Sequence, residues 1–380
     1  MVEWDKKATK AFEALKEALC SNPVLVVPDF EKEFIVQTDA SEVGLGAVLS
    51  QELKAITLLY QQRHCVLLGY LIFLSSLLFL CEVPLDPPNQ YGSILNMSSP
   101  VTLSPWNHNC SSEPPFLVIL VTSEPYSFIV RKAIRSTWAK NRVVAGKPVL
   151  IIFLLGSFPG SSIQQVALAA EDRVYGDVLQ RDFVDSYYNL TLKTLMGLQW
   201  VAQACPGASY VFKTDSDVFV NIQRLLPLLL RRATHTHLYT GRVSLEGEPV
   251  RNPNSKYYVS KTEFPFDYYP PFCSGTGYVL SMDLVWDILT VSPTVREIKL
   301  EDVFIGMCLN TLGVQPSYLS SVQVFYNYMV PFHPCPYSLL VTSHGLRPAQ
   351  LHWAQKAVER VSRDRCFQEQ LADLNVMGEI

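Results

Sequence analysis

Two aspartates one residue apart in the stretch YVFKTDSDVFVN, residues 210–221, are the first candidates for chemistry in this sequence. Apolar residues flank the pair, and the two-residue period of an extended strand puts Asp215 and Asp217 on one face. Carboxylates that face the same way repel each other, and burying them unpaired costs several kcal/mol. They therefore need a cation, a hydrogen-bonded turn or open water. A calcium loop is excluded, because the twelfth position from Asp215 is Leu226 rather than Glu.

The elements around this pair predict how it is positioned. The run FLVILVTS at 116–123 is typical of a buried strand, VRKAIRSTWAK at 130–140 has helical character, and KPVLIIFLLG at 147–156 is a second buried strand. Strands that alternate with helices indicate an α/β domain with a mostly parallel central sheet. In such sheets ligands bind beyond the carboxyl ends of the strands, and the two aspartates come at such an end.

One apolar segment decides the expected compartment. Residues 63–83 include CVLLGYLIFLSSLLFLCEV, which carries no charge from Cys65 through Cys81 and approaches the length of a transmembrane helix. Lys54 and Arg63 precede it and the next basic residue is Arg131, so the positive-inside rule predicts a single-pass type II signal anchor with the C-terminal part in the lumen. A cleaved signal peptide or a buried core helix are the alternatives; a signal peptide fits less well because the segment lies far from the N-terminus.

Downstream features agree with an oxidising, glycosylating lumen. Sequons begin at Asn96, Asn109 and Asn189. An even set of cysteines predicts up to three disulfides whose pairing the sequence leaves open. The set is Cys110, Cys205, Cys273, Cys308, Cys335 and Cys366.

The chain of 380 residues is 48% hydrophobic and has a formal net charge of -4, so a sizeable core is expected and nucleic-acid binding is not. We expect five parts: a cytosolic segment, the membrane anchor, a Pro- and Ser-rich stem, a catalytic domain and a tail. Their boundaries are 1–62, 63–83, 84–114, 115–366 and 367–380.

The first fifty residues resemble a different kind of protein. The stretch KAFEALKEALCSNPVLVVPDFEKEFIVQTDASEVGLGAVLSQ is similar to the junction between polymerase and RNase H in retroelement polyproteins, in which TDAS holds the first catalytic carboxylate, here Asp39. An RNase H needs several carboxylates to hold two metal ions, and none follows before the apolar segment, so we expect no nuclease activity.

From about Phe116 to Cys366 the chain resembles the β1,3-galactosyltransferase family of Golgi enzymes, which are metal-dependent and have a GT-A-like fold. Seven motifs occur in family order over roughly 250 residues. They are RKAIRSTW (131–138), FLLG (153–156), YGDVLQRDFVDSYYNLTLKTL (175–195), FKTDSDVFVN (212–221), FCSGTGYVLS (272–281), EDVFIG (301–306) and HGLRP (344–348).

The resemblance implies a role for each candidate residue. Asp215 and Asp217 match the metal-binding pair, which holds Mn²⁺ and the donor UDP-galactose, and His344 matches a further metal ligand, although alone it reads as a loop histidine. Carboxylate, imidazole and phosphate groups suit Mn²⁺. Asp302 matches the general base of an inverting transfer, with its neighbour Glu301 as an orienting or capping residue.

Arg131 and Arg135, four residues apart on one helix face, match residues that support the donor site. An ordinary solvated helix face is the alternative. Aromatic residues at 264–272 are candidates for stacking on sugar faces or for core packing.

The sequence therefore predicts a hexosyltransferase of the Golgi membrane. Its expected reaction moves galactose from UDP-galactose to the 3-hydroxyl of an N-acetylhexosamine, GlcNAc or GalNAc, on a glycoprotein or glycolipid. A β1,3-N-acetylglucosaminyltransferase and a non-catalytic lumenal binding protein are the alternatives, and the intact acidic motifs speak against the second.

Overall fold

The structure is a computed structural model that divides into two units, Met1–Gln90 and Tyr91–Ile380. It describes the strands within residues 25–56, and residues 100–106, 110, 112–157 and 162–360. The predicted anchor at 63–83 and the tail at 367–380 lie outside the described residues. Within them, no helix combines the length and the apolar character that crossing a bilayer requires.

The first unit contains a four-stranded sheet in the order β1-β4-β3-β2. Strands β2 and β3 pair antiparallel from Ile35 opposite Ser50 to Ser41 opposite Gly44, and Asp39 lies in β2 opposite Gly46. Strand β4 is antiparallel to β3 and parallel to β1. The strands span Leu25–Val26 (β1), Ile35–Ser41 (β2), Gly44–Gln51 (β3) and Lys54–Ile56 (β4).

The second unit is built on a mixed sheet in the order β12-β13-β10-β6-β8-β9-β5, with β7 paired to β8. Its four central strands, β10, β6, β8 and β9, run parallel, whereas both edges are antiparallel. This confirms the predicted α/β domain with a parallel centre. The strands are β5 (Val101–Leu103), β6 (Leu117–Thr122), β7 (Val143–Val144), β8 (Lys147–Ser157), β9 (Val178–Val184), β10 (Tyr210–Asp215), β12 (Tyr239–Ser244) and β13 (Phe272–Ser281).

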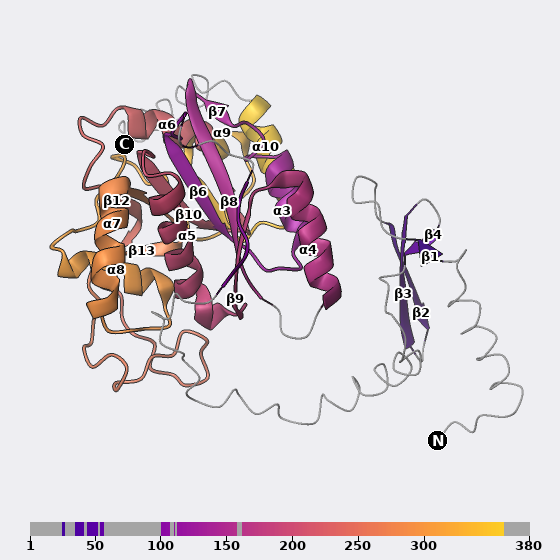
Figure 1. Ribbon diagram of the computed structural model, residues 1–380, viewed down its shortest axis with the longest axis horizontal. Coiled ribbons are helices and arrows are strands. Elements are labelled where there is room, and N and C mark those ends of the chain that lie inside the picture. The colour runs from indigo at the N-terminus through magenta and orange to yellow at the C-terminus, as the bar shows by residue number, and fades with distance from the viewer. Residues whose placement is uncertain are drawn as a thin grey trace, which may run out of the picture. The chain divides into compact units, whose positions relative to one another are not determined.

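Helices cover both faces of this sheet, and successive residues of a strand point alternately into the two core layers that the helices close. In β6, Leu117, Ile119 and Val121 point into one core cluster, while Val118 and Leu120 point into the other. Figure 1 shows α3 and α4 on one side of the sheet and α5, α7 and α8 on the other. The helices are α3 (Phe128–Ser136), α4 (Ser162–Tyr175), α5 (Leu190–Ala204), α6 (Ile222–Leu230), α7 (Met282–Val291), α8 (Glu301–Thr311), α9 (Pro334–Leu339) and α10 (Pro348–Arg360), with 3-10 turns η2 (Tyr187–Asn189) and η3 (Ser292–Thr294).

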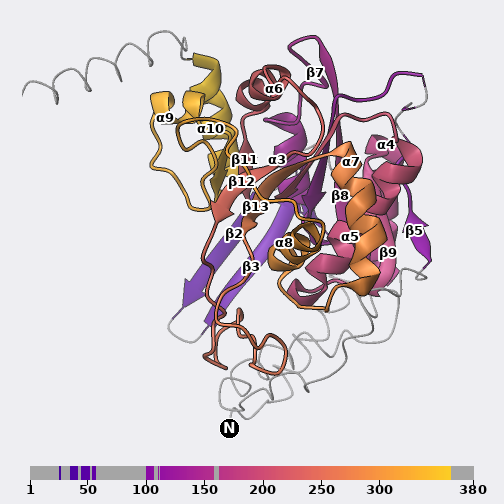
Figure 2. The same ribbon diagram turned by 90° about the vertical axis from the view of Figure 1, so that its left-hand side faces the viewer.

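A separate two-stranded sheet of β11 (Val218–Val220) and β14 (Thr342–His344) follows the D-x-D pair. Asn221 follows β11 and caps α6: its side chain accepts a hydrogen bond from the Arg224 N–H and donates one to the Tyr337 carbonyl. Helices α9 and α10 lie next to each other beside β11 (Figure 2). This arrangement brings the C-terminal segment around His344 next to the aspartates.

The predicted stem contributes to the second unit. Residues 101–103 form the edge strand β5, and Cys110 is disulfide-bonded to Cys205 at the end of α5. Cys335 is also disulfide-bonded, whereas Cys273 and Cys308 are free and buried. A cross-link that closes a long loop restricts the unfolded chain, so the Cys110–Cys205 bond stabilises the domain.

Candidate active site

Asp215 is fixed at the carboxyl edge of the parallel sheet. It is the last residue of β10 and lies opposite Thr122, the last residue of β6. The Thr122 Oγ1 donates to Asp215 Oδ1 over 2.7 Å, and the Lys213 Nζ donates to the same oxygen over 2.8 Å. Asp215 therefore holds a defined position at the edge where ligands of parallel sheets bind.

Asp217 meets His344 because β11 and β14 pair antiparallel. The register puts Val218 opposite His344, and the His344 Nε2 lies 3.2 Å from Asp217 Oδ2. This hydrogen bond raises the pKa of His344; although partial burial pushes the pKa of Asp217 up, His344 holds it below its ordinary value. Asp217 and His344 are 127 positions apart in the sequence, and the fold brings the carboxylate of one beside the imidazole of the other.

Asp302 and Glu301 begin α8, but their environments differ. Glu301 is 4% exposed, accepts a hydrogen bond from the Tyr278 hydroxyl over 2.5 Å, and lies 3.2 Å from the Lys213 ammonium. Asp302 is half-buried and accepts from the Gly275 N–H and the Val303 N–H, each over 2.9 Å. Of the two carboxylates, Asp302 is the one open to a substrate.

Burial raises the pKa of the Asp302 carboxyl above its ordinary value, against the lowering effects of the Gly275 N–H and the Lys213 ammonium. Its place in the first turn of α8 favours the ionised form, since the helix N-terminus carries partial positive charge. A carboxylate with a raised pKa that is partly open to solvent is suited to accept a proton.

The chemistry of the donor set at Asp217 and His344 fits a divalent transition metal such as Mn²⁺. Among the described residues, no three His, Cys, Asp or Glu side chains converge as a complete metal site. An ion held by Asp217 and His344 would take further oxygen ligands from a bound diphosphate.

Arg131 and Arg135 lie in a buried ion-pair network with Glu171 and Asp177. The Arg131 side chain bonds to Glu171, to the Ser123 hydroxyl and to the carbonyls of Glu124 and Pro125, which engages all five of its N–H donors. It thereby fixes the loop that directly follows Thr122. Direct contact of Arg131 with a nucleotide stays a prediction.

Arg135 continues the same network. It bonds to Glu171 over 2.6 Å and forks onto both carboxylate oxygens of Asp177. Its guanidinium also lies over the Tyr175 ring, 4.0 Å from the centroid. The solvated helix face that the sequence left open does not occur at these two residues, because Arg131 is fully buried and the Arg135 side chain is 9% exposed.

Glu171→Ala is expected to destabilise the folded protein by about 3–5 kcal/mol, because it leaves the Arg131 guanidinium buried without its counter-ion. Denaturant unfolding of both proteins measures this difference. Asp267→Ala is the matched control, since it removes one partner of the exposed Lys261–Asp267 pair and should leave the unfolding midpoint unchanged. A midpoint for Glu171→Ala equal to that of the control would contradict a structural role for the network.

Exposed tyrosines lie near the two acidic groups. Tyr187 of η2 is 36% exposed and packs edge-on against Tyr188 at 5.9 Å and Tyr257 at 6.2 Å. Burial raises the pKa of Tyr187, and the nearby Asp302 and Asp215 add to the effect. These rings offer sugar-stacking surfaces beside the carboxylates.

The aromatic residues at 264–272, predicted either to stack on sugars or to pack in the core, divide between buried and exposed positions. Phe264 and Tyr269 are buried and pack together at 4.8 Å, as core residues do. Phe266 and Tyr268 are 67% and 55% exposed and stay candidates for sugar contact.

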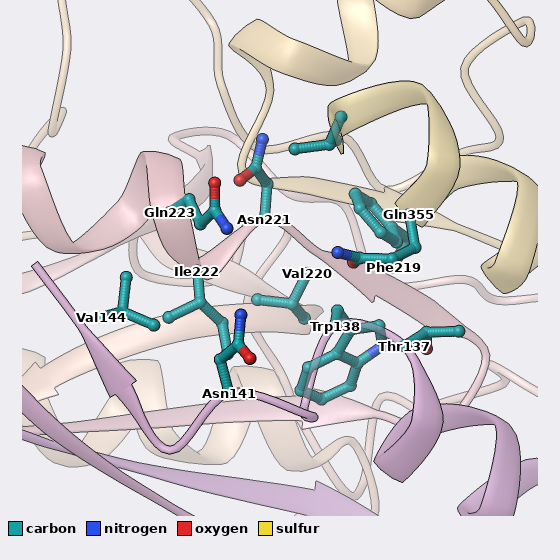
Figure 3. Close-up of a pocket in the computed structure, with 11 residues that line it drawn as sticks. Thr137, Trp138, Asn141, Val144, Phe219, Val220, Asn221, Ile222, Gln223 and Gln355 are labelled. Atoms are coloured by element: carbon teal, nitrogen blue, oxygen red, sulfur yellow. The ribbon is translucent and has the colours of Figure 1, made fainter. Parts of the chain in front are cut away.

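A small pocket behind β11 is separate from the candidate site. Its lining includes Trp138, Asn141, Asn221 and Gln355 (Figure 3) and none of the candidate catalytic or metal-binding residues. The Trp138 Nε1 is buried and has no hydrogen-bond partner within the described part of the chain. A cavity of about 20 Å³ has room for one water molecule and excludes a nucleotide sugar.

Lys213 and Thr122 are the main contributors that sequence reasoning missed. A lone lysine in the apolar run YVFKTD was the available signal, because a buried ammonium requires acceptors. Thr122 gave no such signal, since its contact with Asp215 depends on the pairing of β6 with β10.

Comparison with known proteins identifies the class. The Galactosyltransferase family matches residues 130–320. Beta-1,3-galactosyltransferase 5 of Gorilla gorilla gorilla is 46% identical over 243 residues, which cover 64% of this chain and 81% of that protein. The human protein of the same name is 44% identical over 258 residues, which cover 68% of this chain and 83% of that one.

The chain is therefore a hexosyltransferase. It belongs to the galactosyltransferase family, and its relatives are beta-1,3-galactosyltransferases, which confirms the resemblance of the catalytic motifs. An RNase H-like domain found in reverse transcriptase matches residues 4–61, which confirms the resemblance of the N-terminal segment.

Similarity to solved structures is weak. The WbbM bifunctional glycosyltransferase has a TM-score of 0.38 at 12% identity, covering 67% of this chain and 51% of that one. The galactosyltransferase LgtC in complex with donor and acceptor sugar analogs has a TM-score of 0.35 at 14% identity, covering 65% and 98%. Neither value assigns the fold.

Proposed function

We propose that this enzyme transfers galactose from UDP-galactose to the 3-hydroxyl of a terminal GlcNAc or GalNAc on a glycoprotein or glycolipid. The transfer is metal-dependent, proceeds with inversion and gives a β1,3 linkage within a GT-A-like domain. The observation that carries the proposal is a chain of hydrogen bonds. It runs from the half-buried Asp302 carboxylate through the Gly275 peptide and the Lys213 ammonium to Asp215 of the D-x-D pair. The names of the relatives support galactose as the transferred sugar.

In this mechanism Asp302 accepts the proton of the acceptor 3-hydroxyl. The hydroxyl oxygen then forms a bond to the anomeric carbon on the face opposite the departing UDP, whose bond to that carbon breaks. An α-linked donor therefore yields a β-linked product. The tyrosines around Tyr187 orient the acceptor ring, and the Thr122 hydroxyl and Lys213 keep Asp215 on the donor side.

Asp217 and His344 would hold Mn²⁺, with Asp215 next to them as a ligand or as a partner of the ribose or of a metal-bound water. When bound, the ion neutralises the negative charge that develops on the diphosphate. Arg131 supports this side through the loop at 123–125, and Arg135 supports it indirectly by holding Glu171, the partner of Arg131.

We place the enzyme in the Golgi membrane as a single-pass type II protein with a lumenal catalytic domain. The Cys110–Cys205 disulfide supports this placement, because such bonds persist in the secretory compartments.

The test is UDP release by the full chain in microsomes from expressing cells, with UDP-galactose or UDP-GlcNAc and with GlcNAc- or GalNAc-terminated acceptors. We expect turnover with UDP-galactose that requires Mn²⁺ and appears only after detergent opens the vesicles. Turnover with UDP-GlcNAc alone would replace the donor by N-acetylglucosamine. Absence of turnover with both donors in a folded protein would overturn the proposal, and activity without detergent would overturn the lumenal placement.

A further inference from the structure

Lys213 is a buried cation that links Asp215 to Gly275 and to Glu301, the neighbour of the candidate base. Its side chain is 1% exposed, and it sits in β10 two residues before Asp215. The ammonium has three N–H donors and three acceptors at hand: Asp215 Oδ1 at 2.8 Å, the Gly275 carbonyl at 2.6 Å and Glu301 Oε2 at 3.2 Å. These acceptors belong to β10, β13 and α8.

The Gly275 peptide connects this cation to the candidate base. Its carbonyl accepts from Lys213, and its N–H donates to Asp302 Oδ2 over 2.9 Å. A Cβ at this position would lie 3.3 Å from Glu301 Oε2, which is a tight contact, and 3.4 Å from Asp302 Oδ2, so glycine lets the backbone approach both carboxylates without displacing either. The orientation of Asp302 thus depends on where Lys213 holds this peptide.

We propose that Lys213 is a positioning residue for the transfer: by fixing the Gly275 peptide it aims the Asp302 carboxylate at the acceptor, and by bonding to Asp215 it keeps that base in register with the donor side. This inference rests on the proposed function of Asp302. The competing explanation is that Lys213 only neutralises the buried carboxylate of Glu301.

A comparison of variants separates the two explanations. Lys213→Met alone would leave Glu301 buried and uncompensated, which is strongly destabilising. The informative pair is therefore Glu301→Gln and the double variant Lys213→Met/Glu301→Gln, which differ only at Lys213. In Glu301→Gln the amide oxygen can still accept from the Lys213 ammonium or the Tyr278 hydroxyl, and the Gly275 and Asp215 bonds of Lys213 persist.

We expect kcat of the double variant to fall about 10- to 100-fold below that of Glu301→Gln, the range that corresponds to one hydrogen bond made by a charged group. The acceptor KM should change little, because Lys213 is buried beneath the base. Equal kcat values for the two proteins would overturn the proposal.

The pH profile gives a readout that a merely structural lysine would not move. Without the Lys213 cation the ionised form of Asp302 is less favoured, so its pKa rises and the acid limb of kcat moves to higher pH relative to Glu301→Gln. An unchanged acid limb would contradict the inference. The titratable groups around Asp302 are Lys213 and Asp215 of β10, Glu301 of α8, Cys273 and Tyr278 of β13, Tyr239 of β12, Tyr187 of η2 and the loop residue Tyr269.

Two further measurements keep the inference falsifiable. Lys213→Arg retains a cation but changes its shape, so a positioning role predicts a lower kcat and pure charge neutralisation predicts wild-type kcat; this variant decides the question if the double variant does not fold. Hydrogen–deuterium exchange of the peptide that contains Gly275 should be faster in the double variant than in Glu301→Gln, whatever the substrate. If the wild-type protein turns over no sugar nucleotide, the proposed function fails, and unchanged exchange would separately overturn the Lys213 assignment.

Discussion

Asp302→Asn is expected to lower kcat for galactosyl transfer by about 10²–10⁴-fold, the usual contribution of a general base. The amide oxygen of asparagine can still accept from the Gly275 N–H or the Val303 N–H, so the helix start keeps its geometry. The amide cannot accept a proton from the acceptor hydroxyl at neutral pH. The KM for the donor should therefore stay close to the wild-type value, and steady-state UDP release measures both constants.

Stability and a matched variant serve as controls for this prediction. Because burial raises the pKa of Asp302 in the folded protein above its unfolded value, the ionised carboxylate disfavours folding at neutral pH, and Asp302→Asn should be at least as stable as wild type. Asp287→Asn replaces an exposed aspartate of α7 and should keep wild-type activity. Full activity in Asp302→Asn would exclude this residue as the base.

The same raised pKa sets the sign of the pH dependence. The base must be ionised, so activity is present above the pKa of Asp302 and is lost as the pH falls through it. We expect this acid limb above the ordinary aspartate range, and it should be absent from the residual activity of Asp302→Asn.

Asp217→Asn should lower kcat/KM by about 10³-fold, because Lewis-acid stabilisation of a leaving diphosphate is worth several kcal/mol and each 1.4 kcal/mol is a factor of ten. An amide is a weaker ligand than a carboxylate for a hard divalent ion. The loss should appear as a higher Mn²⁺ concentration for half-maximal rate. A manganese titration at fixed UDP-galactose measures it.

A second aspartate–histidine pair provides the matched control. Asp283 Oδ2 lies 3.1 Å from His237 Nδ1. Asp283 comes two residues after Ser281, which pairs with Tyr210 at the start of β10, whereas Asp215 is at the other end of that strand. Asp283→Asn removes a similar pair outside the candidate site and should leave the manganese titration unchanged. An equal response of Asp217→Asn and Asp283→Asn would mean that the Asp217–His344 pair is structural.

Carboxylates outnumber cations among the buried groups around Lys213. Lys213 pairs with both Asp215 and Glu301, and the pKa of this lysine is raised despite its burial because the two carboxylates hold its proton. The half-buried Asp302 adds further negative charge. In the proposed mechanism a bound divalent ion would offset part of this negative charge.

Local patterns were enough for the parallel centre of the sheet and the position of the acidic pair at its edge. The run at 116–123 is apolar on both faces because β6 is covered by helices on both sides, and that burial is written directly into the residue types. The family motifs identified the class from sequence alone because each of them is a short contiguous stretch. The antiparallel edges were not predicted, since β12, β13 and β5 join the sheet by long-range pairing.

The sequence by itself determined the residue types that can do the chemistry: two aspartates one residue apart after a buried strand, an acidic pair at a helix start, and a histidine in a short motif. The structure ends β10 at Asp215 and places Asp217 in the turn before β11, so the two do not share one extended strand. Only the tertiary structure decided how they divide the work. Glu301 and Asp302 are neighbours in the chain, yet β13 buries one against Lys213 and leaves the other half-open. His344 reaches Asp217 through the pairing of β14 with β11, and Arg131 turns inward to Glu171. Such contacts depend on segments far apart in sequence, and the burial and charge that set each side chain's role arise only when those segments pack together.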